Sequence, residues 1–194
     1  MVTYDSKTAL AVVDVQNDFA DPNGSLFVPG APDIIATINS EIERAAAAGA
    51  SVVYTQDWHP PDTPHFAKDG GTWPVHCVIG TWGAELHPDL DVRGEVIRKG
   101  SGGEDGYSGF SVRDPESGEV GSTRLESTLR DRGVERVVVI GLATDYCVKE
   151  TALDALRRGF ETTVLSKAVR AVDLQPGDGE EALAEIAAAK GRVE

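Results

Sequence analysis

The sequence predicts an α/β fold: one domain over residues 1–194, with a parallel sheet of about six strands and helices on both faces. Short apolar, β-branched runs alternate along the chain with longer segments of helical periodicity, as in repeated β-α-β units. The runs are continuously apolar rather than alternating, which favours strands buried on both faces. A chain of 194 residues suits one such domain.

Five of the apolar runs are predicted to be strands, and a short sixth strand is predicted at the end of the chain. The five are Ala9–Val15, Ser51–Thr55, Glu95–Arg98, Arg136–Ile140 and Glu161–Leu165, and the sixth is Arg192–Glu194.

Four segments between these strands are predicted to be helices, each followed by a glycine that suits a helix C-terminus. They are Pro32–Ala48, Ser122–Arg132, Thr144–Arg158 and Glu180–Lys190. The first has a proline in its first turn and a stripe of isoleucines along one side. The second carries Thr123 and Glu126 at the spacing of a capping box.

Two long segments, from Asp57 to Pro88 and from Lys99 to Gly121, fit neither pattern. The first is rich in histidine, proline, tryptophan and glycine, and the second is glycine-rich and polar. Long loops inside a compact domain are usually functional or disordered. The histidines and aromatic residues of the first loop favour function.

Charge and composition exclude several classes of partner. The net charge is −14 at pH 7, which repels phosphate backbones and anionic lipids, so we expect neither nucleic acid nor a membrane as partner. No apolar run is long enough to span a bilayer, and Met1 to Lys7 lacks the pattern of a signal peptide. We expect a cytoplasmic protein that acts on a small molecule, and a homo-oligomer is compatible with the sequence.

Ligands of an open parallel sheet bind outside the carboxyl ends of the strands, and three reactive side chains fall there. Asp14, Lys99 and Cys147 follow or end the first, third and fourth predicted strands. Asp14 stands in an apolar run and needs a compensating partner, for which Lys99 is the natural candidate. A purely structural ion pair between two strands is the alternative.

The chain has two cysteines, too few for a disulfide scaffold. Cys147 is predicted in the first turn of a helix, where unpaired N–H groups and the helix dipole favour the thiolate. Backbone N–H groups near Ala143 and Cys147 can hold an oxyanion, which completes the parts of an acyl-transfer site. The alternative is an inert buried cysteine, which is our interpretation of Cys77.

Three of the four histidines fall between positions 59 and 76, close after Asp57. Histidine with carboxylate suits zinc, iron or manganese, and an extended Asp-x-His pair places both side chains on one face. Ordinary loop histidines are the alternative, and the fourth histidine, His87, is expected on the surface. Phe19, Trp73 and Tyr107 lie in loops at the same edge, where aromatic faces suit a flat ring.

Three segments together resemble the signatures of the isochorismatase-like cysteine hydrolases, in order and spacing. They are Val12–Phe19, Arg98–Gly100 and Gly141–Val148. The segments Asp57-x-His59, His65 and Trp73-Pro74-x-His76-Cys77 resemble the metal site of the nicotinamidase and pyrazinamidase branch of that family.

The resemblance implies a set of functional residues. It implies a triad of Asp14, Lys99 and Cys147, metal ligands Asp57, His59, His65 and His76, a cis peptide between Leu142 and Ala143, and a substrate pocket that includes Phe19, Trp73, Tyr107, Leu142, Ala143 and Tyr146. It also implies hydrolysis of nicotinamide, and of pyrazinamide, to the acid and ammonia through a cysteine thioester. One divalent ion, zinc before iron or manganese, would bind the substrate ring.

Three other functions are compatible with parts of the pattern. One is a hydrolase of the same family that acts on another small amide or a carbamoyl amide. Another is a metal-binding redox sensor that uses Cys77 and Cys147, although no C-x-x-C is present. The third is a catalytically inactive binding protein of this fold, which the intact set of Asp14, Lys99 and Cys147 argues against.

Overall fold

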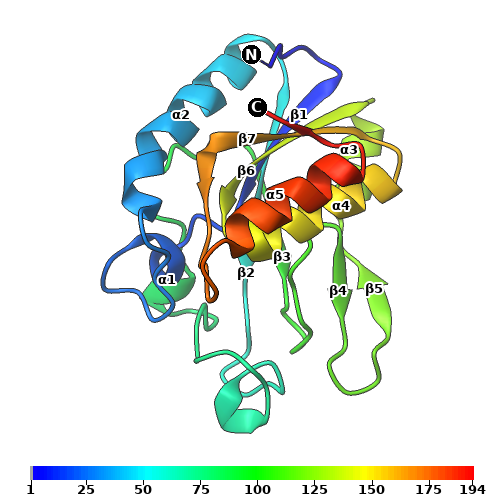
Figure 1. Cartoon of the computed structure of the whole chain (residues 1–194). Helices are drawn as coiled ribbons and strands as arrows, with labels where there is room; N and C mark the ends of the chain where they lie inside the picture. The colour runs from blue at the N-terminus through cyan, green and yellow to red at the C-terminus, as the bar shows by residue number, and fades with distance from the viewer. Residues whose placement is uncertain (1) are drawn as a thin grey trace.

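A computed structural model describes residues 2–194 and confirms the predicted fold class. Six parallel strands form the sheet in the order β3-β2-β1-β6-β7-β8 (Figure 1). Their bounds are β1 Thr8–Val13, β2 Ser51–Asp57, β3 Glu95–Lys99, β6 Arg136–Leu142, β7 Glu161–Arg170 and β8 Arg192–Val193.

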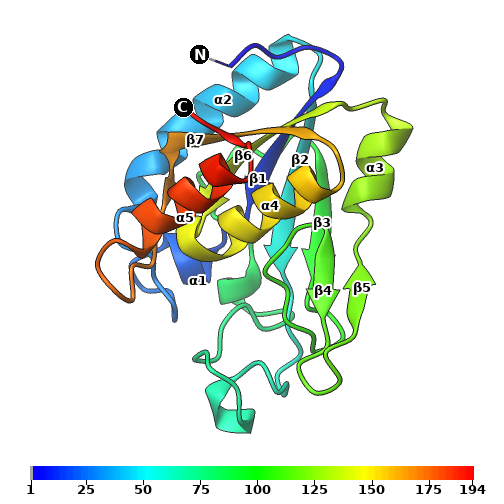
Figure 2. The ribbon, with the colours of Figure 1, turned by 45° about the vertical axis from the view of Figure 1, so that its right-hand side comes forward.

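Helices cover both faces of the sheet. One face carries α2, whose buried isoleucines form the predicted stripe, and the opposite face carries α3, α4 and α5 (Figures 1 and 2). The helices are α1 Asn17–Ala20, α2 Ala31–Ala47, α3 Leu125–Asp131, α4 Lys149–Arg157 and α5 Asp178–Ala188, with 3-10 turns at Ala67–Asp69 and Trp82–Ala84. No helix among the described residues is long and apolar enough to cross a membrane.

The order of the strands places a topological switch point between β1 and β6. From β1 the chain builds outward through β2 and β3, and from β6 it builds outward on the other side through β7 and β8. The two strands approach closely at Gly141, where an added Cβ would lie 2.2 Å from the carbonyl oxygen of Val13. Asp14 and the segment before Cys147 therefore leave the sheet side by side, at the place where ligands of such sheets bind.

The region from Lys99 to Gly121 is more ordered than the sequence predicted. It contains β4, Ser111–Arg113, which pairs antiparallel with β5, Val120–Ser122. Strands of three residues with largely exposed side chains give no continuous apolar run, so the apolar pattern does not detect them.

The helix predicted from Ser122 begins only at Leu125. The hydroxyl of Thr123 donates to the Gly109 carbonyl at 2.6 Å and accepts from the Leu125 amide at 3.1 Å, so no capping box with Glu126 forms. Tertiary contact with the preceding loop decides this helix start.

Two other helices differ from prediction by more than one residue, whereas the ends of α2, α3 and α4 lie within one residue of the predicted ends. A π-helical turn, η3 Thr144–Val148, precedes α4, so Cys147 lies in that turn rather than in a regular first helical turn. Helix α5 begins at Asp178 and ends at Ala188, in each case two residues before the predicted bounds Glu180 and Lys190, and Lys190 itself has a positive φ of 72°. The glycines after α2, α3 and α4 all adopt the left-handed conformation expected there.

Candidate active site

Lys99 joins two buried carboxylates at the carboxyl edge of the sheet. Its Nζ atom lies 2.7 Å from Asp14 Oδ2 and 2.5 Å from Asp57 Oδ1, and it also donates to the Gly106 carbonyl. Burial alone would lower the pKa of Lys99, but Asp14 and Asp57 overcome it and hold the pKa well above its usual value. The structure thus confirms the Asp14–Lys99 pair and adds Asp57 as a second partner.

The two oxygens of Asp14 have different surroundings. Oδ1 accepts a hydrogen bond of 2.6 Å from the Thr55 hydroxyl, while Oδ2 faces Lys99 and accepts no well-aligned hydrogen bond. Asp14 has a φ of 47°, a conformation that side chains rarely adopt and that tends to occur at functional sites. Burial raises the pKa of Asp14, and Lys99 opposes that rise.

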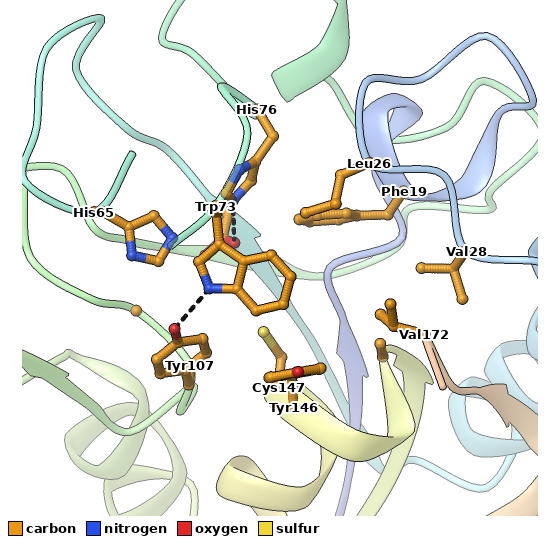
Figure 3. A pocket seen from close by; sticks show the side chains of 13 residues that line it. Phe19, Leu26, Val28, His65, Trp73, His76, Tyr107, Tyr146, Cys147 and Val172 are labelled. Atoms are coloured by element: carbon orange, nitrogen blue, oxygen red, sulfur yellow. Dashed lines mark hydrogen bonds and ion pairs between the residues drawn. The ribbon is translucent and has the colours of Figure 1, made fainter. Parts of the chain in front are cut away.

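Cys147 lies against this carboxylate–lysine group and opens onto a pocket. Its Sγ atom is 3.7 Å from Lys99 Nζ, and one ligand-type atom each of Asp14, Asp57 and Cys147 lies within 4.8 Å of the others. Figure 3 shows the sulfur pointing into the pocket.

The pKa of Cys147 differs from the sequence prediction. Burial raises it well above the usual value, although Lys99 lowers it, so desolvation outweighs the helix-terminus effect that favoured a thiolate. A buried, protonated thiol reacts as a nucleophile only after a base removes its proton, and the Asp14 carboxylate lies within 4.8 Å of the sulfur.

The polypeptide enters this turn through a cis peptide bond between Leu142 and Ala143, the one that the family resemblance implied. Ala143 and Cys147 both line the pocket, so the backbone of the turn borders the space where a substrate carbonyl would lie. Leu142, predicted among the substrate-binding residues, is not in the pocket lining and packs in the core on the α2 side.

Three buried histidines form a second cluster beside Asp57. One ring nitrogen each of His59, His65 and His76 lies within 4.8 Å of the others. The Nε2 atoms of His59 and His76 are 3.8 Å and 3.9 Å from Asp57 Oδ2. The predicted Asp57-x-His59 arrangement, with both side chains on one face, is therefore present.

The donor set fits a divalent cation. Both ring nitrogens of His59 are buried without a hydrogen-bond partner, which is costly unless another group satisfies them. Burial lowers the pKa of His65, and that of His76 to about 4, so both rings are neutral at pH 7 with a lone pair to offer. Three imidazoles and a carboxylate suit zinc, iron or manganese.

Aromatic and aliphatic side chains wall the pocket above Cys147 (Figure 3). The Trp73 indole donates to the Tyr107 hydroxyl at 2.7 Å and meets the Tyr146 ring edge-on with a centroid distance of 4.8 Å. Phe19 lies on the opposite side, carried by α1 rather than by a loop as predicted.

The sequence interpretation missed further lining residues, namely Leu26, Val28, Gly106 and Val172. They are single small or apolar residues in loops, and nothing in their local sequence distinguishes them from ordinary packing. It also missed Asp105, whose carboxylate contacts the ring of His65 at 2.6 Å.

Two residues outside the cluster test the remaining predictions. His87 is buried rather than at the surface; its ring accepts a hydrogen bond from the Asp89 amide at 3.2 Å, and its own amide donates to the Val15 carbonyl. Cys77 is a buried free thiol whose pKa is raised by burial, as an inert packing cysteine requires. No disulfide joins it to Cys147.

A buried cysteine, a carboxylate and a lysine meet at the switch point of this parallel sheet, and together they supply the parts of an acyl-transfer site. Comparison with known proteins agrees: the isochorismatase domain family matches residues 8–193. The chain belongs to the isochorismatase family.

Individual relatives resemble the chain over most of its length. It is 43% identical to a nicotinamidase/pyrazinamidase of Mycobacterium tuberculosis, over 87% of this chain and 86% of that protein. The crystal structure of the pyrazinamidase of Pyrococcus horikoshii in complex with zinc has a TM-score of 0.86 and 41% identity, over 97% and 98% of the two chains. An L. infantum protein solved in complex with nicotinate has a TM-score of 0.88 and 37% identity, over 100% and 95%.

Proposed function

We propose that the protein is a nicotinamidase, which hydrolyses nicotinamide, and also pyrazinamide, to the free acid and ammonia. The observation that carries the proposal is the buried group of Asp14, Lys99 and Cys147, which opens onto an aromatic pocket beside three histidines. Relatives described as nicotinamidase, pyrazinamidase and a nicotinate complex support the substrate.

In the proposed mechanism, Asp14 acts first as base and then as acid. Its Oδ2 atom takes the proton of the Cys147 thiol, and the sulfur attacks the carboxamide carbon. Lys99 stabilises the negative charge that this proton transfer leaves on sulfur. The proton on Asp14 then passes to the leaving nitrogen as the C–N bond breaks, and ammonia departs.

The backbone stabilises the charge that develops on the carbonyl oxygen. The proposed donors to this oxyanion are the amide N–H groups of Ala143, which precedes the π-helical turn, and of Cys147 within it. After ammonia leaves, the acyl group remains on Cys147 as a thioester. A water molecule, deprotonated by Asp14, adds to the thioester carbon. Asp14 returns that proton to the sulfur as the C–S bond breaks, which releases the acid and restores the thiol.

The walls of the pocket select a flat, uncharged ring. Trp73, Tyr107 and Phe19 offer aromatic faces, and Tyr146 and Ala143 close the space near the sulfur. Asp57, His59, His65 and His76 would hold one divalent ion, with zinc the first candidate and iron or manganese the others. Such an ion, when bound, supplies a Lewis acid that a pyridine-type nitrogen can coordinate.

Ammonia release from nicotinamide by the purified protein tests the proposal. We expect release that falls after chelator treatment and returns when zinc is restored. Release on other small amides or carbamoyl amides, with none on nicotinamide from folded and metal-loaded protein, would contradict the substrate and favour the related hydrolase.

A matched pair of cysteine variants tests the nucleophile. Cys147→Ala should lose at least about a thousandfold in turnover while retaining its fold, because a covalent step cannot proceed without the sulfur. Cys77→Ala, the control for a buried thiol, should keep most of its turnover. Substantial activity in Cys147→Ala would refute the mechanism, and equal losses in both variants would indicate a redox or structural role for the thiols.

A further inference from the structure

Two of the clustered histidines have one ring nitrogen engaged outside the cluster. The Nδ1 atom of His65 lies 2.6 Å from Asp105 Oδ1, and that of His76 lies 2.7 Å from the Pro74 carbonyl oxygen. A carboxylate and a carbonyl only accept hydrogen bonds, so both Nδ1 atoms must carry the proton. The neutral rings therefore keep their lone pair on Nε2, which in His76 faces Asp57.

Of the two acceptors, only that of His65 is a side chain, and a distant segment supplies it. Asp105 belongs to the loop after β3 and is 40 positions from His65. Its backbone is fixed on both sides by β4, since its amide donates to the Arg113 carbonyl at 2.8 Å and its carbonyl accepts from the Arg113 amide at 2.9 Å. The β4–β5 hairpin thus holds the Asp105 carboxylate at a defined place beside the ring.

The side chains of His65 and Asp105 are buried to different extents. The His65 side chain is 4% exposed and the Asp105 side chain 23% exposed. The ring is therefore enclosed by the protein, and the Asp105 carboxylate is the acceptor that reaches its Nδ1 atom. His59 differs, because neither of its ring nitrogens has such a partner.

We propose that Asp105 is a positioning residue that fixes the His65 ring with Nε2 toward the metal site. The inference rests on the metal site of the proposed function. A carboxylate that accepts from the far nitrogen of a metal-binding imidazole sets its tautomer and increases its strength as a ligand. Loss of such a partner typically costs about 10- to 100-fold in metal affinity.

The tautomer can be measured directly in metal-free protein by ¹⁵N NMR of the ring nitrogens, and the chain has only four histidines to assign. We expect His65 in the wild type to carry its proton on Nδ1. Asp105→Ala should shift the His65 ring toward the other tautomer. Glu104 is a neighbouring acidic residue whose side chain accepts a hydrogen bond from the Gly102 amide, and Glu104→Gln should leave the spectrum unchanged. A His65 ring protonated on Nε2 in the wild type would overturn the proposal.

The metal affinity is measured with Zn²⁺ alone, by competition with a chromophoric chelator and without substrate. We expect the zinc dissociation constant of Asp105→Ala to rise about 10- to 100-fold. Asp105→Asn, whose amide oxygen still accepts from Nδ1, should lie between Asp105→Ala and wild type, and Glu104→Gln should match wild type.

A purely structural role predicts a different pattern. It would lower the unfolding midpoint of the metal-free Asp105→Asn protein without changing its zinc affinity, and that result would overturn the proposal. Failure of the wild type to bind zinc would overturn it as well. Ammonia release from nicotinamide by that same zinc-free protein would show that the amidase function stands without this metal site, so the two failures are distinguishable.

Discussion

Gly141→Ala should destabilise the protein more than the same change at a left-handed glycine where an added methyl would meet no other atom. Gly141 has a φ of 114°, and its added methyl would lie 2.2 Å from the oxygen and 2.7 Å from the nitrogen of Val13. The backbone conformation costs about 1–2 kcal/mol and overpacking about 1–3 kcal/mol, so we expect a loss of about 2–5 kcal/mol. Both contacts are with backbone, which cannot rotate away.

Gly159→Ala is the matched control for this prediction. Its φ is 80°, but nothing lies within 4 Å of an added Cβ, so only the conformational cost of about 1–2 kcal/mol applies. Urea unfolding of both variants measures the difference. We also expect Gly141→Ala to lose at least about tenfold in turnover, since a misplacement of about 1 Å between Asp14 and Cys147 carries a cost of that order or more. Equal stabilities of the two variants would refute the argument from contact with Val13.

Three further substitutions test separate contacts, two in the site and one on α4. Trp73→Leu should raise KM for nicotinamide about 3- to 10-fold with a smaller effect on kcat, because aromatic stacking contributes about 0.5–1.5 kcal/mol; steady-state kinetics measures both, and an unchanged KM would contradict a ring-binding wall. Thr55→Val removes the hydroxyl that donates to Asp14 Oδ1 and should cost about 1–3 kcal/mol in urea unfolding; an unaltered unfolding free energy would refute that bond. Burial alone would raise the pKa of Asp154, but hydrogen bonds from Ser111 and Ser108, together with Arg158 and Arg157, lower it in the folded protein. The stability that this provides should be lost as the pH falls through the lowered pKa. Asp154→Asn should therefore show a flatter acid limb of stability, and a slope like that of wild type would rule the residue out.

The elements that the sequence predicted well are those in which one local signal dominates. Continuous apolar runs located the central strands, and left-handed glycines after α2, α3 and α4 marked the helix ends. The convergence of Asp14, Lys99 and Cys147 also followed from local information, because parallel strands bring their carboxyl ends to one edge.

The features that the sequence did not reveal depend on contacts between distant segments. Asp57 lies beside Lys99 in register across β2 and β3, so one lysine serves two carboxylates. The burial of His87 and the partnership of Asp105 with His65 likewise arise only when loops pack together. The pKa of Cys147 is raised because burial outweighs the opposing effect of Lys99. The position of the residue just before a helix does not reveal that outcome.

The placement of Lys99 between Asp14 and Asp57 has a consequence for redesign of the site. One buried ammonium forms ion pairs with both the carboxylate of the proposed base and a carboxylate of the proposed metal site. A metal-independent amidase made from this scaffold by deleting only the histidines would keep Asp57 as a competitor for that ammonium. Conversion of Asp57 to a neutral residue in the same step would leave Lys99 paired with Asp14 alone. The histidines and Asp57 therefore have to be replaced together.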